Sequence, residues 1–127
     1  FSPWTNLTCN TDTYYSRKKA DPMFTKQMPK DAAERYVPES IDKSNSYVSP
    51  FYGDFTGLPR GLIIAGENEI LLDDSRIVGE NAKKDGVEIE VQIWPKIFHD
   101  WWLFGPLLPE SKKCLLGVQK WINGFDV

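Results

Sequence analysis

The amino-acid sequence predicts an α/β fold in which parallel strands alternate with helices. An unbroken apolar run at residues 61–66 is flanked by Gly and Pro, as in a strand that is covered on both faces. Residues 71–86 follow with apolar side chains at helical spacing, and residues 87–94 then alternate strictly between apolar and polar side chains. A strand, a helix and a second strand in this order are typical of a parallel βαβ unit.

The helix expected between the two strands opens with Asp73, Asp74 and Ser75. We interpret the two carboxylates as capping groups, because negative charge stabilises the N-terminal end of a helix dipole. The buried face is expected to carry Leu71, Ser75, Val78 and Ala82. Gly86 follows as the residue that ends the helix.

The strand at residues 87–94 is expected to bury only one of its faces. The buried side chains are Val87, Ile89, Val91 and Ile93, and the solvated ones are Glu88, Glu90 and Gln92. A last helix is expected from Pro109 to Phe125, since proline suits the first turn of a helix. The inner face of this helix carries Cys114, Val118, Trp121 and Phe125.

The first half of the chain is less regular. Residues 1–4 resemble the end of a strand interrupted by Pro3, and short helices are expected at 13–20 and 29–37. Residues 40–52 are rich in Ser, Asn and Pro and are expected to form a loop. The two helices would form an insertion between strands, placed as a lid over the edge of the sheet.

Composition excludes several classes of function. The chain has 127 residues, 41% hydrophobic residues and a net charge of −3, so it can build a core but has no basic surface for nucleic acid. Its apolar stretches fall far short of the roughly 20 residues that span a bilayer. The first residue is Phe1 and no signal peptide is visible. We therefore expect a cytoplasmic protein whose N-terminal part is absent from this chain.

Two residues that follow the predicted strands could carry chemistry. Glu69 follows the strand at 61–66, and His99, the only histidine, follows the strand at 87–94. Parallel strands deliver the loops after their carboxyl ends to one edge of the sheet, so an acid and a base are expected there. A serine nucleophile needs such a base, and the base needs a carboxylate to orient it. Asp73 is the second candidate for the acid.

Other catalytic groups are missing from the sequence. No Gly-x-Ser-x-Gly turn is present, so no nucleophile is expected within these residues. With one histidine and two separated cysteines, neither a metal centre nor a cofactor site is expected. Phe98, Trp101 and Trp102 surround His99 in sequence and could line a substrate pocket or belong to the core.

The sequence resembles the C-terminal half of the hormone-sensitive-lipase family of α/β-hydrolase esterases and lipases. The resemblance rests on Phe1-Ser-Pro-Trp4, Ser49-Pro-Phe-Tyr52, Gly66-Glu-Asn-Glu-Ile-Leu-Leu-Asp-Asp-Ser75, His99 and Phe104-Gly-Pro-Leu-Leu-Pro109. Family members commonly carry Asp-Pro-Leu-x-Asp, whose first Asp is the acid of a catalytic triad. Glu69-Ile-Leu-Leu-Asp73 occupies that motif, so Glu69 replaces the usual Asp. After the family's histidine a Gly or Val is common, and here the residue is Asp100.

The resemblance implies the C-terminal portion of an α/β-hydrolase fold. Residues 1–12 would be a strand end and loop, 13–40 a helical lid or cap insertion, and 41–127 the C-terminal βαβα part of the core. The parent protein would be a serine carboxylic ester hydrolase with a Ser-His-Glu triad, whose nucleophile and oxyanion motif lie upstream of Phe1. This chain alone would be inactive. The implied partners are the missing N-terminal half, a small ester and, through the last strand or helix, a second copy in a homodimer.

Two alternatives remain open from the sequence. The first is a non-catalytic α/β-hydrolase-like binding module, which would have lost the nucleophile in its upstream part. The second is a stand-alone domain in which Glu69 and His99 have structural roles only. A sheet that stops at Phe1 would expose an edge and an apolar face, which disfavours the second alternative.

Overall fold

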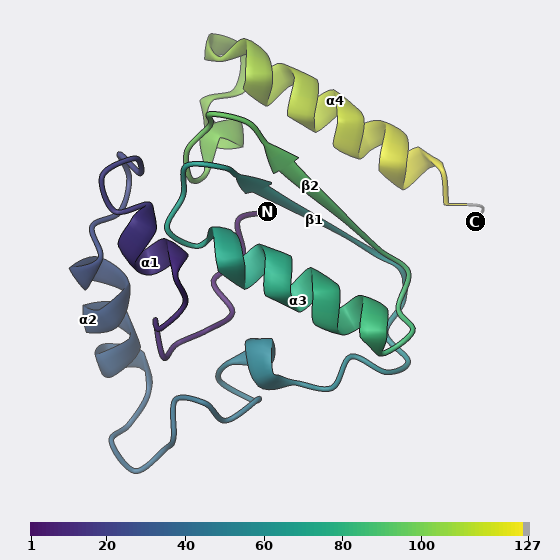
Figure 1. Ribbon diagram of the computed structural model, residues 1–127. Coiled ribbons are helices and arrows are strands. Elements are labelled where there is room, and N and C mark those ends of the chain that lie inside the picture. Colours follow the sequence, from purple (N-terminus) through teal and green to yellow (C-terminus); the bar gives the residue numbers. More distant parts are fainter. Residues whose placement is uncertain (126–127) are drawn as a thin grey trace.

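The computed structural model describes residues 1–125 and has two parallel strands between two helices (Figure 1). β1 (Gly61–Gly66) pairs with β2 (Ile89–Trp94), with Gly61 opposite Ile89 and Gly66 opposite Trp94. α3 (Leu72–Lys84) connects the strands on one side of the pair, and α4 (Pro109–Asn123) lies on the other side. The predicted α/β class and the order strand, helix, strand, helix are confirmed.

The two faces of β1 are both covered because its side chains alternate in direction. On one face, Val91 lies so close to Gly79 of α3 that a Cβ atom at Gly79 would collide with its side chain, and Ile63 would be in ordinary contact with that atom at 3.9 Å. On the other face, Ile64 is buried together with Trp101 and Cys114 of the C-terminal region. The predicted burial of Cys114 in the core is therefore confirmed.

The face of β2 that the sequence predicts as solvated is partly covered. Glu90 is exposed as expected, but Gln92 is half-buried, and Trp94 packs into the cluster around Trp101. Conversely, Ile93 was expected to be buried and is 37% exposed. The strand's own alternation cannot predict the covering of Gln92 and Trp94, because α4 comes later in the chain and returns across their face.

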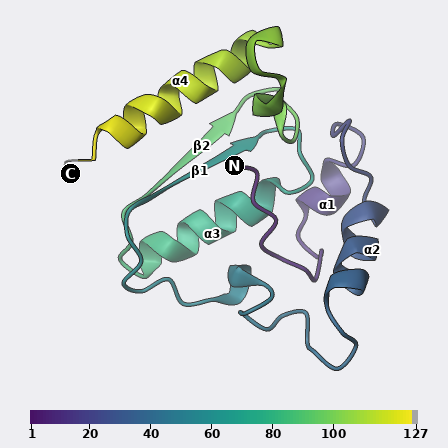
Figure 2. The same cartoon turned by 180° about the vertical axis from the view of Figure 1, so that it is seen from behind.

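In the N-terminal half, the two helices lie beside the carboxyl ends of the strands, and the segment that follows them runs along α3 to the beginning of β1 (Figure 1 and Figure 2). This half contains two α-helices, α1 (Thr13–Ser16) and α2 (Gln27–Tyr36), and the short 3₁₀ turn η1 (Pro50–Tyr52). A second 3₁₀ segment, η2 (Trp101–Leu107), precedes α4. None of the helices within residues 1–125 combines the length and the apolar composition that crossing a membrane requires.

The first predicted helix is wrong in its length, since it ends at Ser16 and does not continue to Ala20. The chain turns over residues 17–21, where the backbone N–H of Asp21 donates to the carbonyl of Arg17. This turn allows the carboxylate of Asp21 to accept the backbone N–H of Ile70 at 2.9 Å, which joins the turn to the beginning of α3. The other predicted helix begins at Gln27, two residues earlier than expected.

Residues 1–4 do not form a strand, although their position resembles one. The backbone N–H of Ser2 donates to the carbonyl of Ile64 at 2.7 Å, on the edge of β1 that faces away from β2. Pro3 has no N–H with which to continue such a ladder. Ser2 also has a φ of 34°, which is incompatible with an extended strand. The N-terminal segment therefore touches the sheet at one point.

Gly79 and Gly117 provide a matched test of how closely the helices approach the sheet. We expect Gly79→Ala to destabilise the fold by about 1–3 kcal/mol, because the added methyl group would collide with the side chain of Val91. Gly117→Ala in α4 has open space around it and should stabilise the helix by up to about 1 kcal/mol. Urea unfolding of the two variants measures the difference. Equal effects of the two substitutions would contradict the close packing of α3.

Candidate active site

The loop after β1 and the loop after β2 are joined directly by backbone hydrogen bonds. The N–H of Asn68 donates to the carbonyl of Ile97 at 2.9 Å, and the N–H of Lys96 donates to Oε2 of Glu67 at 2.9 Å. A Cβ atom at Gly66 would lie 2.5 Å from the carbonyl oxygen of Ile97. Only glycine permits this approach of the two backbones. The expectation that the loops after the two parallel strands meet is therefore confirmed.

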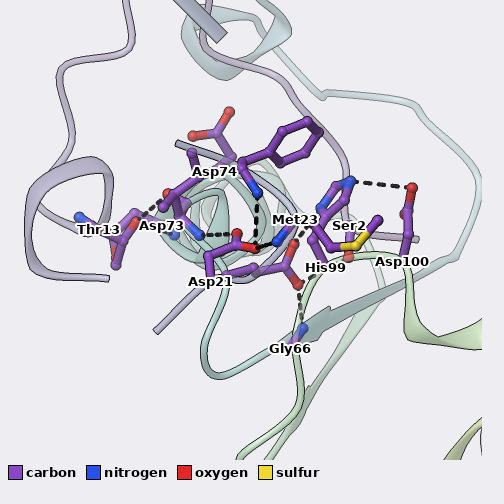
Figure 3. Close-up of polar contacts among 12 residues, drawn as sticks. Ser2, Thr13, Asp21, Met23, Gly66, Asp73, Asp74, His99 and Asp100 are labelled. Atoms are coloured by element: carbon purple, nitrogen blue, oxygen red, sulfur yellow. Dashed lines mark hydrogen bonds and ion pairs between the residues drawn. The ribbon is translucent and has the colours of Figure 1, made fainter. Parts of the chain in front are cut away.

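The carboxylate of Glu69 is completely buried and has three hydrogen-bond partners. Its Oε1 accepts the backbone N–H of Gly66 and the hydroxyl of Ser2, the latter at 2.9 Å. Its Oε2 lies 2.9 Å from Nδ1 of His99. Figure 3 shows Ser2, Gly66 and His99 close together at this place. A buried charge is tolerated only with such partners.

His99 is held between this carboxylate and an aromatic ring. Its exposed fraction is 7%, and the centroid of its ring lies 4.5 Å from that of Phe24. Because the oxygens of Glu69 accept hydrogen bonds, Nδ1 carries the hydrogen and Nε2 is the nitrogen available for proton transfer. The nearest charged atom to Nε2 that the structure records is Oδ2 of Asp100, at 3.2 Å.

A pocket of about 660 Å³ opens next to His99. Most of its wall comes from the N-terminal segment and α2, which together with Leu71 make it largely apolar. The lining includes Phe1, Ser2, Pro3, Trp4, Phe24, Met28, Pro29, Asp31, Ala32, Arg35, Leu71, His99 and Asp100. The arrangement places an imidazole with an oriented Nε2 at the edge of an apolar cavity.

Of the two alternatives for the aromatic residues near His99, a pocket wall or the core, the structure shows the core. Trp101 is fully buried in the cluster with Ile64, and Phe98 and Trp102 pack against that cluster. None of the three lines the pocket beside His99. The reason is that η2 turns back under the sheet after Asp100, so the rings fill the space between β1 and α4.

Asp73, the second candidate for the acid, has other partners. Its Oδ2 accepts the backbone N–H of Thr13 at 3.1 Å, and its Oδ1 lies 3.9 Å from Arg76. The partner recorded for Nδ1 of His99 is Glu69. The geometry therefore supports Glu69 over Asp73 as the group that orients the imidazole.

Asp73 and Asp74 both lie in the first turn of α3, where negative charge was expected, but neither side chain caps the helix by a hydrogen bond. Asp74 instead accepts the backbone N–H groups of Thr5 and Asn6, both at 2.8 Å. Its burial raises its pKa to about 6, although these two hydrogen bonds act in the opposite direction. The first turn of α3 thus holds the N-terminal segment that lines the pocket.

The two cysteines are free and buried, and burial raises the pKa of both thiols. A thiol with a raised pKa is a poor nucleophile. Sequence reasoning did not find Ser2, Gly66, Phe24 or Asp100, which all contact Glu69 or His99. The departure of Asp100 from the family pattern was the only visible signal for any of these contacts.

Comparisons with known proteins show the family to which the chain belongs. The sequence profile of the alpha/beta hydrolase fold family covers residues 1–103 of the chain. The chain belongs to this family. An acetyl-hydrolase of Streptomyces hygroscopicus is 35% identical over 90% of the chain, and an esterase of Acinetobacter venetianus is 26% identical over 99%.

Solved structures of similar proteins extend the match. An esterase/lipase from an uncultured bacterium is 38% identical with a TM-score of 0.90 over 96% of this chain. An esterase of the bacterial hormone-sensitive lipase family is 30% identical with a TM-score of 0.92 over 95%. The resemblance to this family that the sequence predicts is thereby confirmed. The chain spans 38–42% of the length of these four relatives, so it corresponds to part of an α/β-hydrolase.

The raised pKa of Asp74 gives a pH dependence of stability. Because the folded state binds this proton more tightly than an unfolded chain does, the contribution of Asp74 to stability falls as pH rises from about 4 to about 6. We therefore expect the unfolding free energy of the wild type, relative to that of Asp74→Asn, to fall by about 2–3 kcal/mol as pH rises over this range. Urea unfolding at several pH values measures it.

Asp54→Asn is the matched control, because Asp54 lies at an exposed turn and its hydrogen bonds to Thr56 lower its pKa. This control should not reproduce the decrease. A difference for Asp74→Asn that stays constant or grows with pH would show that the folded protein does not favour the protonated carboxyl group.

Proposed function

We propose that this chain is the C-terminal part of a serine carboxylesterase and supplies the acid Glu69 and the base His99 of a Ser-His-Glu triad. The observation that carries the proposal is the buried contact of 2.9 Å between Oε2 of Glu69 and Nδ1 of His99, at the edge of an apolar pocket. A carboxylate in this position selects the tautomer of the base and stabilises the imidazolium that forms during catalysis.

The mechanism uses a serine hydroxyl from the part of the protein that would precede Phe1. The serine oxygen bonds to the ester carbonyl carbon, its proton passes to Nε2 of His99, and the carbonyl π electrons move to the oxygen. When the carbonyl re-forms, the bond to the alcohol breaks and the alcohol leaves with the proton from Nε2. Water then repeats the two steps and releases the acid and the serine.

The pocket indicates the substrate class within this proposal. Trp4, Phe24, Met28 and Leu71 give it an apolar wall that suits the hydrocarbon part of an ester. We propose esters with short to medium acyl chains as substrates, and residues 13–40 as the lid that covers them. Matched proteins named as esterases and as an acetyl-hydrolase support this class of reaction.

The proposal also covers the exposed apolar surface of η2 and α4. Leu103 and Leu107 are 72% and 86% exposed, and Leu116 and Ile122 on α4 are also exposed. Exposed apolar surface of this kind marks contacts with other protein surfaces. We assign it to the N-terminal part of the same protein and to a homodimer contact through α4.

The roles of Glu69 and His99 can be tested in the full-length protein. We expect His99→Ala to lower kcat for a p-nitrophenyl ester by about 10⁴-fold or more, with Glu69→Gln also lowering it by orders of magnitude. The physical reason is that the serine loses its base or the base loses its orientation. Steady-state kinetics measure kcat, and circular dichroism confirms that each variant is folded.

Asp73→Asn is the matched control, since Asp73 lies in the same motif but contacts Thr13 and Arg76. Its kcat should stay near that of the wild type. If this substitution abolished turnover while Glu69→Gln did not, the acid would be Asp73. Full activity in His99→Ala would exclude His99 as the base of the triad, whereas absence of turnover in the wild-type full-length protein would favour the non-catalytic binding module.

The 127-residue chain by itself is expected to have no esterase activity, because the nucleophile lies outside it. The measurement combines the intact mass of the sample under denaturing conditions with an assay on a p-nitrophenyl ester. Turnover by a sample that contains only the 14.6 kDa species would contradict the proposal. A second polypeptide with a Gly-x-Ser-x-Gly sequence would explain any activity of a mixed sample.

A further inference from the structure

The side of His99 that faces away from Glu69 carries a second carboxylate. Oδ2 of Asp100 lies 3.2 Å from Nε2, and Figure 3 shows this contact as a dashed line between the two residues. We propose that Asp100 is a positioning residue that holds the protonated imidazolium of His99 and competes with the serine hydroxyl for Nε2. The inference rests on the proposed function, because it concerns the base of that triad.

The position of the hydrogens determines when this contact is attractive. Nδ1 of His99 carries a hydrogen for Oε2 of Glu69, so a neutral ring presents only a lone pair at Nε2. A lone pair and a carboxylate oxygen repel each other. An imidazolium has a hydrogen on both nitrogens and can donate to both carboxylates. Asp100 therefore stabilises His99 when the base is charged and cannot accept a proton from serine.

The backbone of Asp100 adopts a conformation that few residues other than glycine tolerate. Its φ of 57° and ψ of 26° lie in the left-handed region, where glycine is the residue with least strain. Asp is among the few other residues that this region tolerates. The side chain of Asp100 is 31% exposed within this chain, compared with 8% for His99, so it reaches Nε2 from the more exposed side of the imidazole.

The other charged groups near His99 have partners of their own or project from α2. Glu69 contacts Nδ1, while Asp21 accepts backbone N–H groups of Met23 and Ile70. From α2, Asp31 and Arg35 line the same pocket and have opposite charges. The rings of Phe24 and Trp102 complete the surroundings of the imidazole. Asp100 is thus the carboxylate that the structure records in contact with Nε2.

The consequence is that Asp100 favours the charged form of the base, which cannot accept the proton of the serine. As pH falls, the imidazolium forms and its Nε2–H is held by Asp100. As pH rises, Nε2 loses its hydrogen, the contact becomes repulsive, and the nitrogen is free for serine. Asp100 therefore acts through the base and has no direct part in bond formation.

The test is the pH profile of kcat/KM for a p-nitrophenyl ester in the full-length protein. Asp100→Gly removes the carboxylate and suits the left-handed backbone, while Asp100→Asn keeps the shape and removes the charge. We expect both to move the acidic limb of the profile to lower pH by on the order of half to one pH unit. Well below the wild-type midpoint this corresponds to about three- to tenfold more activity.

Asp31→Asn is the control for a general effect of charge in the pocket, and its limb should move less than that of either Asp100 variant. An unchanged limb in both Asp100 variants would overturn the proposal, as would an equal shift in Asp31→Asn. A plateau that falls by more than about tenfold in both would also overturn it, since Asp100 would then assist turnover. Full activity in His99→Ala would instead overturn the triad itself.

Discussion

The structure depends on giving hydrogen-bond partners to the buried carboxylate of Glu69. A charge in the interior is destabilising unless it is paired and hydrogen-bonded. Here the partners come from three separate segments: Ser2 from the N-terminal stretch, Gly66 from the end of β1, and His99 from the loop after β2. The requirement to satisfy one side chain therefore joins segments that are far apart in the sequence.

Carboxylates perform a similar task where the N-terminal half meets α3. Asp74 accepts backbone N–H groups at Thr5 and Asn6, and Asp21 accepts that of Ile70. These contacts place the N-terminal segment and the turn after α1 next to the loop that carries Glu69. The pocket beside His99 consequently has a wall from the N-terminal half and a reactive edge from the C-terminal half. Loss of either half would remove the pocket.

Two departures from the pattern of the hormone-sensitive-lipase family meet at the same imidazole. Glu69 stands where an Asp is usual, and its longer side chain still reaches Nδ1 of His99 at 2.9 Å. Asp100 stands where Gly or Val is common, and its carboxylate reaches Nε2 at 3.2 Å. The single histidine is therefore flanked by acids on both ring nitrogens.

The sequence by itself determined the strand, helix, strand, helix order, since periodicity depends only on neighbouring residues. It also determined that Glu69 and His99 would meet, because parallel strands bring their following loops to one edge. Only the tertiary structure decided that Trp101 fills the core, that Asp74 holds the N-terminal segment, and that Ser2 and Asp100 complete the site. These features arise between distant segments or from the backbone angles of a loop, and local sequence patterns carry no record of either.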